Sequence, residues 1–140
     1  SIIEQAKIAD VFINNAYAPN AQIILLNKIF EAWRDDSTKT IINMGSKAKY
    51  FPTGQVQATP TMAQYTLNKR MLTEETQRMQ FYSQKQCRII SINPGFVDTA
   101  MTQQLERSKL TPEAIADSVM WALEMPQDVE IGELSIWTRE

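Results

Sequence analysis

The stretch TIINMGS, residues 40–46, decides the fold class of this chain. Its adjacent isoleucines, Ile41 and Ile42, are typical of a buried strand, and a glycine and a serine follow at the strand's end. Two more short apolar runs, ADVFIN and RIISIN, also have the composition of buried strands. With LSIWT near the end of the chain, we expect strands at residues 9–14, 40–44, 88–93 and 134–138.

The segments between these strands have the pattern of helices. We expect helices at residues 20–33, 61–85 and 112–125. The first places Ile23, Leu26 and Phe30 on one face of a 3.6-residue period. The last begins with Thr111 as cap and Pro112 at the first helical position. This alternation predicts an α/β protein with a parallel sheet and helices on both faces, in which ligands bind at the carboxyl ends of the strands.

Composition excludes several kinds of site. The 140 residues are sufficient for one domain, and a formal net charge of −2 does not favour a nucleic-acid partner. Without histidine, and with Cys87 as its one cysteine, the chain cannot build a His/Cys zinc site, a Ser-His-Asp triad or an internal disulfide. No apolar run approaches the ~20 residues of a membrane helix, and no secretory leader pattern is present. We therefore expect a cytoplasmic protein without a metal site.

The run YTLNK, residues 65–69, carries the most informative chemistry. Residues at i and i+4 share a helix face, so the Tyr65 phenol and the Lys69 ammonium can point into one site. An ammonium nearby favours phenolate and makes tyrosine a better acid/base at neutral pH. Ser46, at a neighbouring strand end, can hydrogen-bond the same substrate oxygen. Simpler roles stay open, namely a surface pair for Tyr65 and Lys69 and a strand-end cap for Ser46.

Five motifs, in this order, resemble the short-chain dehydrogenase/reductase family. They are ADVFINNAY at residues 9–17, TIINMGS at 40–46, YTLNK at 65–69, INPGFVDTAM at 92–101 and LTPEAIADSVMWAL at 110–123. The resemblance covers nearly all of the chain, but only about the C-terminal half to three-fifths of the family's domain. It implies that residues 1–140 form a single partial Rossmann-like domain that is N-terminally truncated.

The resemblance implies a role for each matching residue. Tyr65 would be the general acid/base, and Lys69 would lower the tyrosine pKa and hold the nicotinamide ribose of NAD or NADP. Ser46 would orient the substrate carbonyl, and Asn20 would relay protons through water to the lysine, although Asn20 can also be a plain helix cap. The residues that would lie on the cofactor side are Asn14, Ala16, Tyr65, Lys69, Pro94, Gly95, Val97 and Thr99.

The sequence also departs from the family. Its four glycines, Gly45, Gly54, Gly95 and Gly132, are far apart, so the glycine-rich phosphate loop that begins the family's domain is missing. Two hypotheses follow. The chain is an NAD(P)-dependent oxidoreductase that interconverts a small alcohol and a carbonyl, or it is a catalytically inactive, truncated relative that serves as a binding or assembly module. Under either, the helices at residues 20–33 and 61–85 resemble the family's dimer helices and imply a homodimer or homotetramer.

Overall fold

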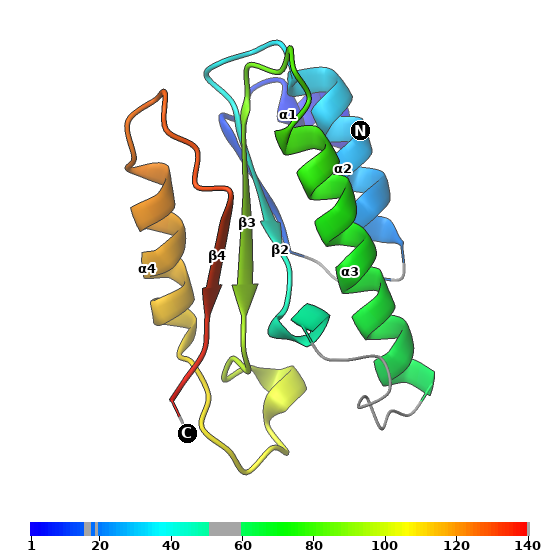
Figure 1. The fold of residues 1–140 in the computed structure, drawn as a ribbon, viewed down its shortest axis with the longest axis vertical. Helices are drawn as coiled ribbons and strands as arrows, with labels where there is room; N and C mark the ends of the chain where they lie inside the picture. Colours follow the sequence, from blue (N-terminus) through cyan, green and yellow to red (C-terminus); the bar gives the residue numbers. More distant parts are fainter. Residues whose placement is uncertain (16–17, 19, 51–59, 140) are drawn as a thin grey trace.

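The computed structural model describes residues 1–15, 18, 20–50 and 60–139. Four parallel strands lie in the order β1-β2-β3-β4 and alternate with helices along the chain (Figure 1). The elements are α1 (Ile2–Ala6), β1 (Val11–Asn14), α2 (Ala21–Trp33), β2 (Thr40–Met44), the 3-10 helix η1 (Lys47–Tyr50), α3 (Pro60–Gln80), β3 (Arg88–Pro94), the 3-10 helix η2 (Ala100–Thr102), α4 (Pro112–Leu123) and β4 (Glu133–Ile136). The predicted α/β class and parallel sheet are confirmed.

Several predicted boundaries differ from those of the structure. The helix expected to reach residue 85 ends at Gln80, because the chain must turn there to enter β3. The Gln80 side chain donates to the carbonyl oxygens of Ile89 and Gly132, at 2.9 and 2.6 Å, and fixes that turn. The start of α4 was predicted correctly, since Thr111 Oγ1 accepts a bond from the Ala114 backbone N–H at 3.1 Å.

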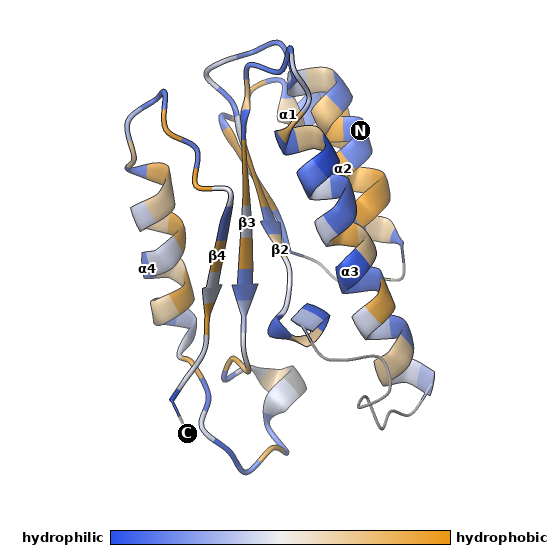
Figure 2. Cartoon of the chain, viewed as in Figure 1, coloured by the Kyte–Doolittle hydropathy of each residue, from blue (hydrophilic) through white to orange (hydrophobic). Residues whose placement is uncertain are grey.

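The sheet separates two apolar clusters. Successive strand residues point to opposite faces, so Ile41 and Ile89 face α2 and α3 while Ile42 and Ile90 face α4. Figure 2 shows the apolar middle of β3 giving way to hydrophilic residues at its carboxyl end. The first cluster is Ala6, Leu26, Ile29, Phe30, Trp33, Ile41, Leu72, Met79, Cys87 and Ile89, and the second is Ile42, Met44, Ile90, Ile92, Val119 and Ala122.

The last crossover differs in hand from the first two. Each new strand is added at the same edge of the sheet, yet α2 and α3 cover one face and α4 covers the other. The connection from β3 to β4 therefore turns the opposite way from its two predecessors. Buried Arg88, at the start of β3, secures this connection by donating to the Leu123 and Met125 carbonyl oxygens at 3.3 and 3.2 Å.

Two kinds of feature do not occur in the part of the chain that the structure describes. No helix there is long and apolar enough to cross a membrane. Within the same residues, no three acidic, histidine or cysteine side chains come together as a group that could hold a metal ion.

Candidate active site

The polar residues predicted to form a site converge at the carboxyl ends of the strands. Strand β2 leads through Gly45 to Ser46, and the first turns of α3 carry Tyr65 and Lys69. The buried Ser46 hydroxyl accepts a hydrogen bond from the Ala48 backbone N–H at 3.0 Å. The simpler role of Ser46, that of a cap at the start of η1, is therefore present in the structure.

Gly45 allows the ends of β2 and β3 to approach closely. Its backbone N–H donates to the Ile92 carbonyl oxygen at 2.7 Å. A β-carbon at this position would overlap the amide oxygen of buried Asn93. Because Asn93 also donates to Glu133 at 2.8 Å, it cannot move aside without losing that bond. A glycine is therefore needed immediately before Ser46.

Lys69 is held at the centre of the group. Its ammonium lies over the Tyr65 ring, 5.5 Å from the ring centroid, so the two residues are adjacent as their spacing predicts. The ammonium donates to Gln22 Oε1 at 2.8 Å and to the Met44 carbonyl oxygen at 2.9 Å. Only 4% of Lys69 is exposed, and burial lowers its pKa from 10.5 to about 8. At neutral pH the side chain thus keeps its charge but sits close to its titration point.

Gln22, in the first turn of α2, is a site residue that the sequence analysis missed. Its side-chain amide donates to the Asn14 carbonyl oxygen at 2.8 Å and to the Met44 carbonyl oxygen at 3.2 Å. Asn14 donates in return to the Gln22 carbonyl oxygen at 2.8 Å and to Asn43 Oδ1 at 3.0 Å. Asn43 then donates to Thr76 Oγ1 at 2.9 Å. We call these five side chains, from Lys69 through Gln22, Asn14 and Asn43 to Thr76, the buried amide row.

Two predicted asparagines have different surroundings. Asn14 is 1% exposed and belongs to the buried amide row, although its Oδ1 atom has no hydrogen-bond partner among the described residues. Asn20 is exposed, with a left-handed φ of 65°, and its side chain makes no capping bond to α2. The side-chain amide that contacts Lys69 directly is that of Gln22, two residues later, and the relay through water from Asn20 stays a prediction. Ala16, also predicted on the cofactor side, lies outside the described residues.

The turn after β3 brings the next predicted residues to the same edge of the sheet. Pro94 is the last residue of β3. The Gly95 backbone N–H donates to the Ile136 carbonyl oxygen at 2.7 Å, which ties the turn to β4. A β-carbon on Gly95 would lie 2.8 Å from the Trp137 β-carbon, so a larger residue does not fit.

Val97 and Thr99 lie farther along this segment. Val97 forms an isolated parallel bridge with Leu110, which closes the segment between them into a loop. Thr99 is exposed and occupies the N-cap position of η2, where its backbone N–H donates to Thr102 Oγ1 at 3.1 Å and its carbonyl oxygen accepts from the Thr102 backbone N–H at 3.0 Å. Val97 and Thr99 both follow the carboxyl end of β3 in the chain.

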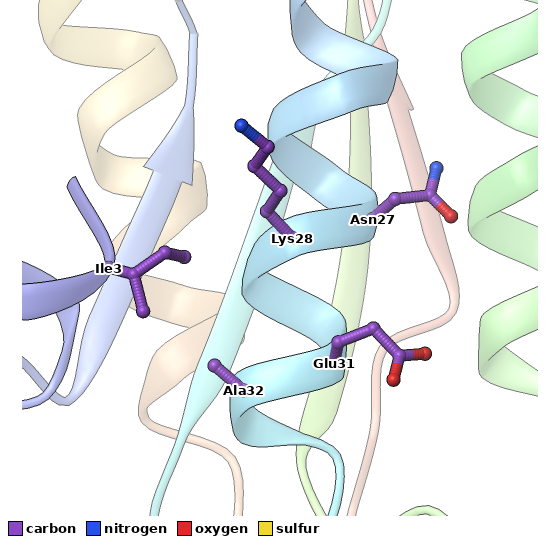
Figure 3. Close-up of a pocket in the computed structure, with 5 residues that line it drawn as sticks. All are labelled: Ile3, Asn27, Lys28, Glu31 and Ala32. Carbon is purple, nitrogen blue, oxygen red and sulfur yellow. The ribbon is translucent and has the colours of Figure 1, made fainter. Parts of the chain in front are cut away.

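A surface depression lies away from this edge. Figure 3 shows its lining residues on α1 and α2, namely Ile3, Asn27, Lys28, Glu31 and Ala32. The depression is shallow and open, and it contains none of the predicted site residues. We therefore describe the candidate site by the contacts of Lys69 and Ser46.

Relatives of known sequence are oxidoreductases. The chain is 35% identical over 104 residues to an uncharacterized oxidoreductase of Staphylococcus epidermidis, a match that covers 71% of this chain and 43% of the relative. It is 40% identical over 52 residues to an uncharacterized oxidoreductase of Staphylococcus aureus, covering 35% of this chain and 22% of that protein. The chain thus spans less than half the length of the curated relatives it matches. No protein-family model matches it.

Solved structures share the fold at low sequence identity. The closed form of serine dehydrogenase complexed with NADP+ has a TM-score of 0.76 at 18% identity, covering 97% of this chain and 70% of its own. 4-Hydroxyisoleucine dehydrogenase complexed with NADH has a TM-score of 0.70 at 17% identity, covering 97% and 71%. A short-chain dehydrogenase/reductase of Brucella melitensis, a glucose/ribitol dehydrogenase, has a TM-score of 0.71 at 16% identity, covering 96% of this chain and 69% of its own.

Proposed function

We propose that this chain, which has the fold of the short-chain dehydrogenases/reductases and oxidoreductases as its sequence relatives, belongs to an NAD(P)-dependent oxidoreductase that interconverts an alcohol and a carbonyl compound. One observation carries the proposal. The Lys69 ammonium is buried beside the Tyr65 ring at the carboxyl edge of a parallel sheet, against the strand that leads to Ser46. Ligands of open α/β sheets bind at this edge.

Each of the three side chains has one task in this reaction. In the reducing direction the Tyr65 hydroxyl gives its proton to the carbonyl oxygen, and in the oxidising direction the tyrosinate takes the alcohol proton. The Ser46 hydroxyl donates to the same oxygen and stabilises the charge that develops there. The Lys69 ammonium, 5.5 Å from the ring centroid, favours the tyrosinate through its positive charge. The nicotinamide cofactor, when bound, supplies or accepts the hydride.

The nicotinamide end of that cofactor would bind at the carboxyl edge of the sheet, a position supported by the buried Lys69 ammonium and by the Gly95 turn beside it along that edge. Lys69 would hold the ribose, and the backbone around Pro94, Gly95, Val97 and Thr99 would flank the carboxamide. Two of the structural neighbours contain NADP+ and NADH, which supports a nicotinamide cofactor without deciding between the two forms. The pyrophosphate end has no glycine-rich loop in these 140 residues, so we assign no phosphate contact.

Cofactor binding tests the proposal directly. Titration of the chain with NADH and NADPH, followed by nicotinamide fluorescence and thermal stability, should give saturable binding that Lys69→Ala removes. Activity is then assayed with a panel of small carbonyl compounds and alcohols, and Tyr65→Phe should lower kcat by about 10²–10⁴-fold. If millimolar cofactor does not bind, this chain is not an oxidoreductase by itself.

A second candidate, a non-catalytic assembly module, is favoured by the exposed apolar side chains of α2 and α3. Ile24, Leu67 and Met71 are 53%, 47% and 51% exposed on these two helices. Exposed apolar residues on adjacent helices favour association with another surface of the same kind. We propose a homodimer through α2 and α3, or a homotetramer that contains it, under either function. Light scattering across a concentration series tests this, and a monomer at all concentrations contradicts it.

A further inference from the structure

Gln22 connects three elements at the carboxyl edge of the sheet. It lies in the first turn of α2 and is 4% exposed. Its side chain contacts the backbone at the ends of β1 and β2 and the ammonium of Lys69 on α3. A buried side-chain amide whose nitrogen and oxygen both have hydrogen-bond partners is held in one position and one orientation.

We infer that Gln22 is a positioning residue for Lys69. The side-chain oxygen of Gln22 holds the Lys69 ammonium beside Tyr65, and the amide nitrogen of Gln22 is anchored to the strand ends. The catalytic part of this inference rests on the proposed function. The contact between Gln22 and Lys69 can nevertheless be tested whether or not the chain turns over substrate.

The surrounding acceptors decide which way the amide of Gln22 points. Its Nε2 atom donates to the carbonyl oxygens of Asn14 and Met44, at 2.8 and 3.2 Å. A flipped amide would place its oxygen against these two acceptors and its donors against the Lys69 ammonium. Because neither arrangement forms hydrogen bonds, Oε1 must face Lys69.

The backbone of Gln22 is anchored as firmly as its side chain. Asn14 Nδ2 donates to the Gln22 carbonyl oxygen at 2.8 Å, while Gln22 donates to the Asn14 carbonyl oxygen at the same distance. This reciprocal pair joins the first turn of α2 to the end of β1. The oxygen that receives the Lys69 ammonium is therefore preorganised.

The ammonium itself is fixed by two acceptors on different elements. Gln22 Oε1 and the Met44 carbonyl oxygen bind two of its three donors, at 2.8 and 2.9 Å. Met44 also accepts from Gln22, so the three groups form a closed triangle. Lysine has a long, flexible side chain, and holding it in one place requires contacts of this kind. Without the Gln22 side chain, the Met44 carbonyl oxygen would be the one acceptor of that triangle left to hold the ammonium.

The test compares variants of Gln22 with the same substitution at a glutamine outside the buried amide row. Gln22→Met keeps the length of the side chain but removes the acceptor, whereas Gln22→Glu keeps an acceptor and adds a negative charge. Gln80→Met is the matched control, because it removes a side-chain amide that donates to the Ile89 and Gly132 carbonyl oxygens without a contact to Lys69 or Gln22. The readout is the Lys69 side-chain titration, followed by NMR of chain labelled with ¹³C at lysine Cε and assigned with Lys69→Met.

We expect Gln22→Met to lower the pKa of Lys69 by about one unit, because a hydrogen bond to a charged group is lost. Gln22→Glu should raise the pKa, and Gln80→Met should leave it unchanged while lowering stability. In an active preparation Gln22→Met should also reduce kcat about tenfold at pH 7 and shift the pH profile, with KM changed little. Gln80→Met should produce neither effect.

Two results would overturn the inference. One is an unchanged Lys69 titration in both Gln22 variants, and the other is a shift in Gln80→Met as large as that in Gln22→Met. Failure of the proposed function gives a different result, because the wild-type chain would then lack NAD(P)-dependent turnover while the NMR titrations still respond to Gln22. If Gln22→Met does not fold, Gln22→Glu alone decides between a raised and an unchanged pKa.

Discussion

The charge of Lys69 should make the stability of the fold depend on pH in a specific direction. The folded chain has a Lys69 pKa of about 8, against the ordinary value of 10.5 that applies to the unfolded chain. Between these values the unfolded chain binds more protons than the folded chain. The free energy of unfolding therefore rises as the pH rises through about 8 and stops rising near 10.5.

The size of this effect follows from the two pKa values. The lowering of the Lys69 pKa by about 2.5 corresponds to roughly 3 kcal/mol. Below pH 8, this free energy is the cost of keeping the buried ammonium charged in the folded chain. Integration between pH 7 and 9 gives a gain in the free energy of unfolding of about 1.3 kcal/mol. Buried Cys87 acts in the opposite direction, since burial raises its pKa from 9.0 to about 11. Over the same interval it costs about 0.4 kcal/mol.

Lys69→Met isolates the contribution of the ammonium. Urea denaturation of both proteins at pH 7, 8 and 9 gives the free energy of unfolding at each pH. The difference between wild type and variant cancels Cys87 and the other groups and should change by about 1.3 kcal/mol in favour of wild type. A difference that stays constant, or that falls as pH rises, would refute the argument that Lys69 is charged, buried and held by neutral acceptors.

Three further changes have expected outcomes. Arg88→Met should lower the free energy of unfolding by about 2 kcal/mol in urea melts, because the carbonyls at the end of α4 lose their donor, and an unchanged midpoint would contradict this. Gly45→Ala should cost about 1–3 kcal/mol, since its β-carbon overlaps the Asn93 side-chain oxygen, and a melting temperature equal to that of wild type would show that the Asn93 side chain can move aside freely. Met71→Glu on α3 should convert the proposed dimer to monomer in light scattering, whereas the equally exposed Met120→Glu on α4 should not.

The fold that the family resemblance implied is confirmed, because a short-chain dehydrogenase/reductase of the same fold matches 96% of this chain. The relatives in sequence are named oxidoreductases, in agreement with that resemblance. The sequence carried this information because the isoleucine pairs of the strands and the Thr111–Pro112 helix start are local patterns. The spacing of Tyr65 and Lys69 is also local, and the structure places the two side chains together.

What the sequence analysis missed depends on contacts between distant residues. Gln22 lies 47 residues before Lys69, and no periodicity links them. A signal was nevertheless present, because Asn43 is a polar residue within a strand predicted to be buried and needs a partner. The end of α3 was missed for the same reason, since Gln86, beyond that helix, donates its backbone N–H to the Arg34 carbonyl oxygen at 2.5 Å, a contact set by tertiary packing.

Because the last crossover has the opposite hand, we expect the two sides of the sheet to differ in their protection against amide hydrogen exchange. Helix α4 packs its face against one side of the sheet by itself, with Val119 and Ala122 as its buried residues, while α2 and α3 share the other side with the buried amide row. A local opening that lifts α4 would leave the contacts of Lys69 with Gln22, Met44 and Tyr65 in place. Amides of α4 should therefore exchange faster than those of α2, and the site chemistry should survive conditions under which the α4 side of the sheet has already opened to solvent.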